Sequence, residues 1–191
     1  MEKIIWKHLI SESKHFLIQW VDIDFGNGKR GVFEMIEFNL SEDQQWWVII
    51  CAYDESSKEI IMIEQFQVAL WKRTFLLPRW WLNPGQTWLQ TAKQELLEET
   101  GYEAKEWKEL SHIYSSPWFF SQNTKLFLAQ WISKSAMWAE WDEIEETIAH
   151  KVLLSDAVNM IIQWIIVDAR TICWLMIAKE YLSNSKVNIK N

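Results

Sequence analysis

Three glutamates that a helix would place on one face constrain this chain more than any other feature. Residues 87–100 repeat leucine and alanine at helical spacing, and Gly101 follows where a helix C-terminal cap belongs. Within that segment Glu95, Glu98 and Glu99 stand at i, i+3 and i+4, so a helix brings their carboxylates together. Like charges at this spacing repel, so the face is either fully solvated or binds cations. Carboxylate oxygens suit Mg²⁺ or Mn²⁺, and spacing alone leaves both interpretations open.

Charge and hydropathy exclude several classes of protein. The net charge is -7 and the basic residues do not cluster, which argues against a nucleic-acid binder, although an acidic protein can handle phosphates through a metal. No apolar run approaches the roughly 18 residues of a membrane span, and the N-terminal stretch lacks the apolar run of a secretory signal. Cys51 and Cys173 lie far apart without metal-type spacing, which indicates two reduced, buried thiols. We expect a cytoplasmic protein that contacts neither membrane nor nucleic acid.

The pattern of apolar residues predicts an α/β (α+β) chain of 191 residues with one main domain. Residues 1–45 hold an antiparallel strand pair whose turn, Gly26-Asn27-Gly28, supplies positive φ at Asn27-Gly28. A unit of that size is unstable alone, so we interpret it as packing on the main body or on a second subunit. Residues 46–185 form the main domain and residues 186–191 a tail. In the main domain we expect strands at 46–53, 59–70, 104–116, 123–132 and 149–154, and helices at 87–100, 155–164 and 168–182.

The glutamate helix resembles the second half of the Nudix hydrolase signature, G-x5-E-x7-R-E-U-x-E-E-x-G-U, where U is apolar. Residues 95–102, ELLEETGY, match it, but the arginine position holds Gln94, the first glutamate position holds Gln86 and the glycine position holds Trp80. The resemblance covers about residues 15–182 and is greatest to the ADP-ribose and ADP-sugar pyrophosphatase branch. It implies a Nudix fold, with a mixed β-sheet packed between helices.

Tryptophan stands where that branch has glycine at five separate positions. These positions are Trp80, Trp81, Trp118, Trp141 and Trp174. The chain holds 15 Trp and only 5 Gly, whereas glycine normally makes up about 7% of residues. Our hypothesis is one systematic cause: a UGA codon that means glycine in one alternative genetic code and tryptophan in another. The gene's codons test it, because UGG throughout would exclude it; an inactivated relative and deliberate engineering are the competing explanations.

The identity of these residues decides what the loop at 78–86 can do. With glycine at 80 and 81 its backbone can approach a diphosphate. With two indoles there, we expect a disturbed or inactive site.

The resemblance also implies the site. Glu95, Glu98, Glu99 and Gln86 are the expected metal ligands, for Mg²⁺ or Mn²⁺, with Glu98 and Glu99 also catalytic. The acidic run at 139–146 supplies Glu143 and Glu140 as candidates for the base that activates water; an exposed acidic loop is the alternative interpretation. The expected substrate contacts are Gly85, Trp80, Trp81, Gln67 and Phe119. A neutral amide at Gln86 coordinates metal weakly, and Gln94 holds Glu95 less firmly than an arginine would.

The resemblance implies a metal-dependent pyrophosphatase that cleaves ADP-ribose or a related ADP compound into AMP and a phosphorylated partner. A homodimer fits that branch. Two alternatives are a catalytically impaired Nudix-fold module that binds a nucleotide or a protein, favoured by Gln86 and Gln94, and an acidic helix on an unrelated α/β domain.

Overall fold

The computed structural model describes residues 1–39, 46–136 and 147–184. In these residues the chain forms ten strands, three α-helices and one short 3₁₀ turn. In chain order they are β1 (Lys3–Glu12), β2 (Phe16–Asp24), β3 (Arg30–Phe38), β4 (Trp46–Asp54), β5 (Glu59–Gln67), the 3₁₀ turn Val68–Leu70, β6 (Lys72–Leu76), β7 (Arg79–Trp81), α1 (Trp88–Thr100), β8 (Tyr102–Ser116), β9 (Phe120–Lys134), β10 (Ile148–Leu153), α2 (Leu154–Ile162) and α3 (Ala169–Asn184).

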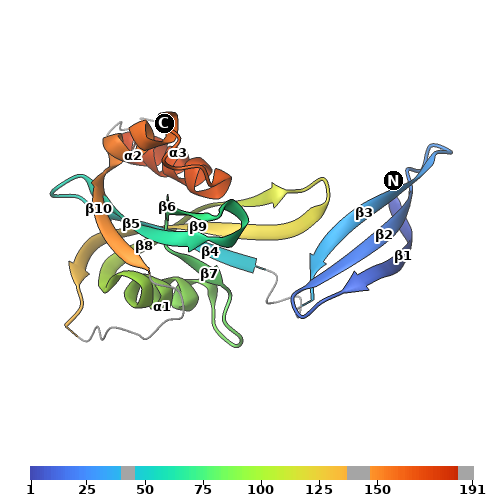
Figure 1. Ribbon diagram of the computed structural model, residues 1–191, viewed down its shortest axis with the longest axis horizontal. Helices are drawn as coiled ribbons and strands as arrows, with labels where there is room; N and C mark the ends of the chain where they lie inside the picture. The colour runs from blue at the N-terminus through green and yellow to red at the C-terminus, as the bar shows by residue number, and fades with distance from the viewer. Residues whose placement is uncertain (40–45, 137–146, 185–191) are drawn as a thin grey trace, which may run out of the picture.

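The strands form one mixed sheet with helices on both faces. Its order is β1-β2-β3-β9-β4-β5-β10, with β6 beside β5, β7 beside β4 and β8 beside β9. Strands β4 and β9 run parallel over their whole contact, whereas β4 and β5 are antiparallel. Helix α1 covers one face of the central strands, and α2 and α3 cover the opposite face (Figure 1). The expected mixed sheet between helices is confirmed.

The central strands are buried on both faces, which explains their continuous apolar sequence. Towards α1, the side chains of Val48 and Ile50 pack with Leu96. Towards α3, Ile49 packs with Leu175. This two-sided core fixes α1 on one face of the sheet and α3 on the other. None of the helices in the described ranges has both the length and the apolar character needed to cross a bilayer.

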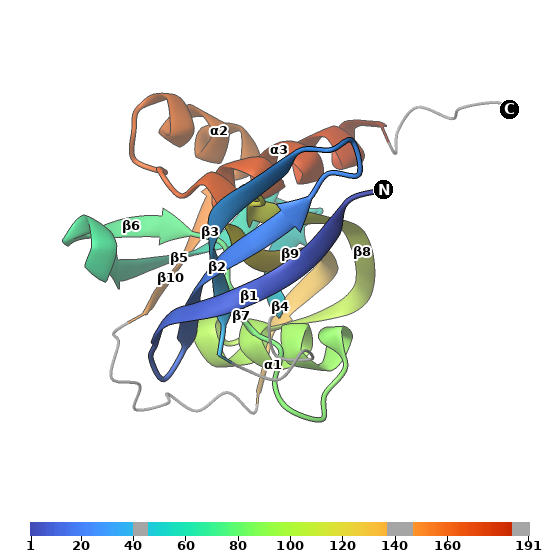
Figure 2. The same cartoon turned by 90° about the vertical axis from the view of Figure 1, so that its right-hand side faces the viewer.

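The N-terminal unit has three strands, not the expected two. Strands β1, β2 and β3 form an antiparallel unit that projects from the main body (Figure 1), and Figure 2 shows the three strands side by side. Strand β1 escaped prediction because both of its faces carry apolar and polar residues, so it lacks the period-2 alternation of a half-buried strand. All ten of its residues are exposed. In the β2–β3 turn, positive φ falls at Gly26 and Gly28, so the expectation for Asn27 was wrong.

Two short strands interrupt segments that the sequence did not divide. The predicted strand at 59–70 ends at Gln67, and β6 follows the 3₁₀ turn. The predicted loop at 78–86 begins as β7, in which Trp80 pairs with Val48 and Trp81 with Trp47. Three residues are too few to show a period, so tertiary pairing with β4 decides this strand.

Three tryptophans occupy a backbone conformation that favours glycine. Among the described residues, four other than glycine have positive φ: Lys58 at 63°, Trp71 at 52°, Trp131 at 56° and Trp164 at 62°. A bulky residue rarely adopts this region, because its Cβ crowds the backbone. After α2, Trp164 donates its N–H to Ile161 O and the next N–H reaches Met160 O, the helix C-cap pattern in which glycine normally takes this place.

The tryptophans that stand where the related branch has glycine are not among these three. Trp80, Trp81, Trp118 and Trp174 all lie outside the positive-φ region. At these four positions φ does not demand glycine. Trp174 is fully buried in the core, and its indole N–H has no hydrogen-bond partner among the described residues. Trp141 lies outside the described residues.

Candidate active site

Helix α1 begins and ends at residues suited to those places. The side chain of Thr87 accepts a hydrogen bond from the backbone of Gln90, whose side chain caps Thr87 in return. Gly101 ends the helix with φ of 72°, and its N–H donates to Leu97 O. A capping box contributes about 1 kcal/mol to helix stability. These two caps define α1 as Trp88–Thr100, the segment that carries Glu95, Glu98 and Glu99.

The three predicted glutamates lie in the last two turns of this helix, and each accepts a hydrogen bond. The donors to Glu95 and Glu99 come from residues before α1, and the donor to Glu98 comes from α1 itself. Glu95 and Glu99 are 4% and 8% exposed. The side chain of Asn83 donates to Glu95 Oε1 at 3.5 Å, and the backbone N–H of Arg79 donates to Glu99 Oε2 at 2.9 Å. Glu98 is half-buried, and Gln94 Nε2 donates to its Oε1 at 2.8 Å. The chain therefore orients three hard oxygen donors of the kind that Mg²⁺ and Mn²⁺ prefer.

The expected pairing of Gln94 is corrected by these contacts. The prediction linked position 94 to Glu95, but the side chain of Gln94 reaches Glu98, one helical turn further along. Residues four apart on a helix are neighbours, whereas adjacent residues face different directions.

The described part of the chain does not hold a complete metal site. In residues 1–39, 46–136 and 147–184, no three acidic, histidine or cysteine side chains converge closely enough to hold a metal ion. The predicted bases Glu140 and Glu143 lie outside the described residues. The donor chemistry of α1 fits a divalent cation, and Mg²⁺ usually keeps water and substrate oxygens among its ligands.

Gln86, one of the expected metal ligands, lies against α1. Its Nε2 donates to Gln94 Oε1 at 2.7 Å, and its Oε1 accepts from Thr91 Oγ1 at 3.0 Å. Gly85 precedes it in an exposed turn with φ of 75° and open space around the Cα atom. The loop thus reaches the helix through Gln86.

The two adjacent tryptophans, both predicted substrate contacts, have different surroundings. Trp80 is 45% exposed. Trp81 packs against the ring of Trp47 at 4.7 Å between centroids and against Phe38 of the N-terminal unit at 4.9 Å. The fold accommodates the indole of Trp81 between the main body and the N-terminal unit, so it does not fill the space over α1.

Arg79 is a buried residue of this region that sequence reasoning missed. Its backbone holds Glu99, its Nη2 donates to Gln67 Oε1 at 2.9 Å, and its Nη1 lies 3.5 Å from Asp168 Oδ2. Gln67, a predicted substrate contact, therefore lies beside an arginine that comes from another strand. No signal in the sequence marks Arg79, because its partners Gln67 and Asp168 come from distant segments.

Asp168 joins this cluster to the start of α3. Its Oδ2 accepts hydrogen bonds from Thr171 N at 2.8 Å and Thr171 Oγ1 at 2.9 Å. Burial raises the pKa of its carboxyl, but the charges of Arg170 and Arg79 and the bonds from Thr171 outweigh burial, so the pKa lies below its usual value. Asp168 is therefore ionised at neutral pH.

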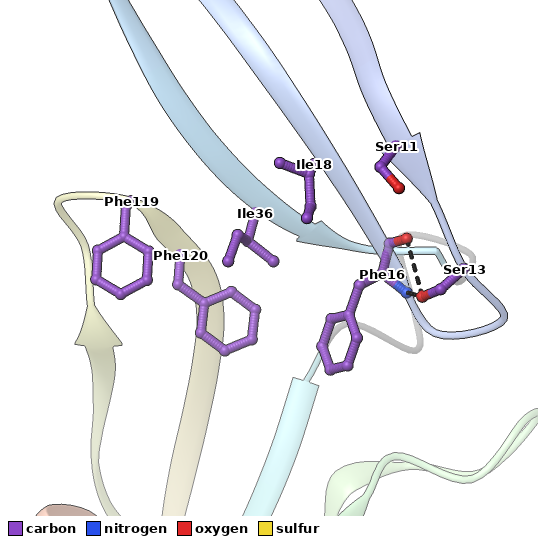
Figure 3. A pocket seen from close by; sticks show the side chains of 7 residues that line it. All are labelled: Ser11, Ser13, Phe16, Ile18, Ile36, Phe119 and Phe120. Carbon is purple, nitrogen blue, oxygen red and sulfur yellow. Dashed lines mark hydrogen bonds between the residues drawn. The ribbon is translucent and has the colours of Figure 1, made fainter.

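Phe119, the remaining predicted contact, borders an apolar groove. The groove has a volume of about 440 Å³ and lies between the N-terminal unit and the start of β9 (Figure 3). Its lining residues are Ser11, Ser13, Phe16, Ile18, Ile36, Phe119 and Phe120. No charged side chain lines it, so this groove suits an apolar group and not a diphosphate.

Known proteins resemble the chain over most of its length. The ADP-ribose pyrophosphatase of Bacillus subtilis (strain 168) is 31% identical over 170 residues, which cover 89% of this chain and 88% of that protein. This chain belongs to the Nudix hydrolase superfamily. Within the superfamily it lies in the branch of the ADP-ribose pyrophosphatases. No protein-family model matches the chain.

Two further proteins resemble the chain over nearly its whole length. The methanol dehydrogenase activator of Bacillus methanolicus is 29% identical over 181 residues, covering 95% of this chain and 92% of that protein. A crystal structure of an ADP compounds hydrolase superposes with a TM-score of 0.82 at 22% identity, over 96% of this chain and 95% of that chain. The superposition establishes the Nudix fold over nearly the whole chain. Nudix hydrolases generally need a divalent metal ion.

Proposed function

We propose that this protein hydrolyses the diphosphate bond of ADP-ribose or a related ADP compound, giving AMP and a phosphorylated partner such as ribose 5-phosphate. The observation that carries the proposal is the set of three glutamates on α1, each held at one oxygen by a hydrogen-bond donor. The relatives support the substrate class, since one is named an ADP-ribose pyrophosphatase and another an ADP compounds hydrolase.

In this proposal the α1 face binds the diphosphate end of the substrate through Mg²⁺ or Mn²⁺. Glu95, Glu98 and Glu99 hold the ion, and Gln86 supports them from the loop. When bound, the ion would neutralise charge on the diphosphate and acidify a water molecule. Glu143 or Glu140, in the acidic run at 139–146, is our proposal for the base that takes the proton from that water.

Five residues remain proposed substrate contacts: Gly85, Trp80, Trp81, Gln67 and Phe119. Gln67 has the best support, because it accepts a hydrogen bond from Arg79, whose backbone N–H also donates to Glu99 of α1. Trp81 has the weakest, because its indole packs against Trp47 and Phe38.

We also propose that the protein is a homodimer joined through its N-terminal unit. Strand β1 is an open sheet edge on which all ten residues are exposed, and such edges pair readily with another chain. Its exposed apolar residues are Ile4, Ile5, Trp6, Leu9 and Ile10. A single exposed apolar residue is ordinary, but a contiguous group of this kind marks an interaction surface.

A cytoplasmic location is proposed on the state of the cysteines. Cys51 and Cys173 are free thiols, and burial raises the pKa of Cys51 to about 12. Cys173 is half-buried, so the expectation of two buried thiols holds for Cys51 only. Reduced thiols without disulfides are typical of proteins kept in a reducing compartment.

The alternative, a Nudix-fold module without catalysis, is not favoured. The relatives that cover most of the chain include a pyrophosphatase and a hydrolase, and the three glutamates of α1 are all present. The helix is part of a fold shared over 96% of the chain, which also removes the unrelated α/β domain as an explanation.

Metal removal and the Glu99→Gln variant test the proposal. A hydrolase should release AMP from ADP-ribose with Mg²⁺, and lose turnover in EDTA. The Glu99→Gln variant should lose about 10²- to 10³-fold, because a neutral amide replaces a charged ligand. Lys93→Ala, on the exposed side of α1, is the matched control and should keep full turnover. Binding of ADP-ribose that persists in EDTA and in Glu99→Gln, without any AMP release even from a version that carries glycine at 80, 81, 118, 141 and 174, would instead indicate the binding module.

A further inference from the structure

The loop before α1 connects to Glu98 through an unbroken series of hydrogen bonds. The backbone N–H of Asn83 donates to Thr91 Oγ1 at 3.2 Å, and that hydroxyl donates to Gln86 Oε1 at 3.0 Å. Gln86 Nε2 then donates to Gln94 Oε1 at 2.7 Å, and Gln94 Nε2 donates to Glu98 Oε1 at 2.8 Å. Each group accepts on one side and donates on the other, and the series ends on a carboxylate.

The direction of these bonds favours a fixed orientation of the Glu98 carboxylate. Hydrogen bonds that run the same way polarise one another, and this effect is larger where water is excluded. Thr91 is fully buried, and the two glutamines are half-buried. A donor at the end of such a series restricts the rotamers of the carboxylate, which is how supporting residues orient metal ligands.

The two glutamines differ from the signature in a matched way. The signature has glutamate at 86 and arginine at 94, which together carry no net charge, and the pair Gln86 and Gln94 carries none either. A single change would have left an unpaired charge beside the glutamates of α1. Because both positions are amides, the loop and the helix remain joined by one short hydrogen bond.

We infer that Gln86 and Gln94 act together as positioning residues, which hold Glu98 in the orientation that binds the divalent metal. This inference rests on the proposed metal-dependent hydrolysis. It assigns to the amide pair the support that an ion pair would otherwise give. Gln94 touches Glu98 directly and Gln86 reaches Glu98 through Gln94, so their effects on the orientation of Glu98 are coupled.

Binding of Mn²⁺ to the full chain, followed by electron paramagnetic resonance of the free ion, tests the inference without relying on turnover. Gln94→Leu and Gln86→Leu should each weaken Mn²⁺ binding about tenfold, the low end of the effect of losing a ligand's supporting residue. The double variant should be no weaker than either single variant, because one break already interrupts the series. Lys93→Ala is the matched control and should bind like the parent chain.

A rescue pair separates positioning from a simple loss of stability. Gln94→Arg alone should weaken Mn²⁺ binding, because the guanidinium charge competes with the metal for Glu98. Adding Gln86→Glu in the same chain should restore binding, since the new carboxylate pairs with the guanidinium. Thermal melting confirms that each variant is folded.

Three outcomes overturn the inference. Mn²⁺ binding by Gln94→Leu within about twofold of the parent chain does so, as does full additivity of the two Leu substitutions. In both cases AMP release by the parent chain would leave the proposed function intact. If the parent chain itself does not bind Mn²⁺, both the inference and the proposed metal-dependent function fail.

Discussion

Individual tryptophans carry the strongest independent support for the codon hypothesis. Positive φ is found at Trp71, Trp131 and Trp164. None of these is one of the five positions at which the related branch has glycine, the positions that first suggested the codon hypothesis. Two of them, Trp71 and Trp164, are 81% exposed, so packing does not explain their large side chains. Backbone geometry and family resemblance therefore indicate the same exchange at different places in the chain.

Replacing these three residues by glycine should stabilise the protein. The left-handed conformation costs a non-glycine residue about 1–2 kcal/mol of folding free energy. Glycine avoids this strain but costs roughly 0.5–1 kcal/mol, because its unfolded chain has more conformational entropy to lose. We expect each of Trp71→Gly, Trp131→Gly and Trp164→Gly to raise the free energy of unfolding by about 0.5–1 kcal/mol in urea titrations.

Trp107→Gly is the control for these substitutions. Trp107 packs against the core, donates its indole N–H to Ala104 O and has no positive φ. Its replacement should destabilise the protein by about 3 kcal/mol or more. A loss of stability in all four variants would contradict the interpretation of the backbone at 71, 131 and 164.

Elements whose apolar pattern extends over many residues could be predicted from sequence. Elements that depend on pairing with a distant strand could not. Helix α1 and its cap at Gly101 follow from leucine spacing, and β4 follows from its continuous apolar run. Strand β7 has only three residues, and it forms by pairing with residues 47–49 of β4, whereas β5 pairs with residues 52–54. The glutamates of the site could be predicted because one helix carries them all.

Residues brought together by several elements remained hidden from sequence reasoning. Arg79 on β7, Gln67 at the end of β5 and Asp168 before α3 meet only after the sheet has formed. No spacing in the sequence encodes their contact. Gln94 was correctly marked as a departure, but its partner was assigned to the wrong glutamate.

The start of α3 should lose stability in acid through Asp168. Its carboxyl pKa is lower in the folded chain than in the unfolded one, so ionisation stabilises the fold above an unfolded pKa of about 4. That contribution is lost as the pH falls through the lower, folded-state pKa. Asp168→Asn keeps a capping side chain but removes the charge that faces Arg79 and Arg170, and should cost about 3 kcal/mol at pH 7.

Urea unfolding of the parent chain and Asp168→Asn at a series of pH values checks this prediction. The difference in unfolding free energy should be constant near neutral pH and shrink below about pH 4. Asp156→Asn, an exposed residue in the first turn of α2, should change stability by less than about 0.5 kcal/mol. A difference between parent and Asp168→Asn that grows as the pH falls would contradict the assigned direction of the pKa shift.

For the molecule as a whole, the projecting N-terminal unit predicts assembly. Strand β1 is open along one side, and its residue Ser11 borders the apolar groove between the N-terminal unit and Phe119 (Figure 3). Sedimentation should give about twice the chain mass of 23.0 kDa. The double variant Trp6→Lys, Ile10→Lys should sediment with the mass of one chain, because charge on an edge strand opposes pairing.

Ile162→Lys, on exposed α2 away from the N-terminal unit, is the control and should leave the mass unchanged. A parent chain that sediments as a single copy would contradict the proposed dimer. So would a Trp6→Lys, Ile10→Lys variant that stays at twice the chain mass.

Release of AMP from ADP-ribose with Mg²⁺ tests the proposed enzyme most directly. The assay compares the chain as written with a version that carries glycine at 80, 81, 118, 141 and 174. We predict Mg²⁺-dependent AMP release by the glycine version, and slower or no release by the chain as written. No AMP release from either version, with both folded and both binding Mg²⁺, would contradict the assignment as an ADP-ribose pyrophosphatase.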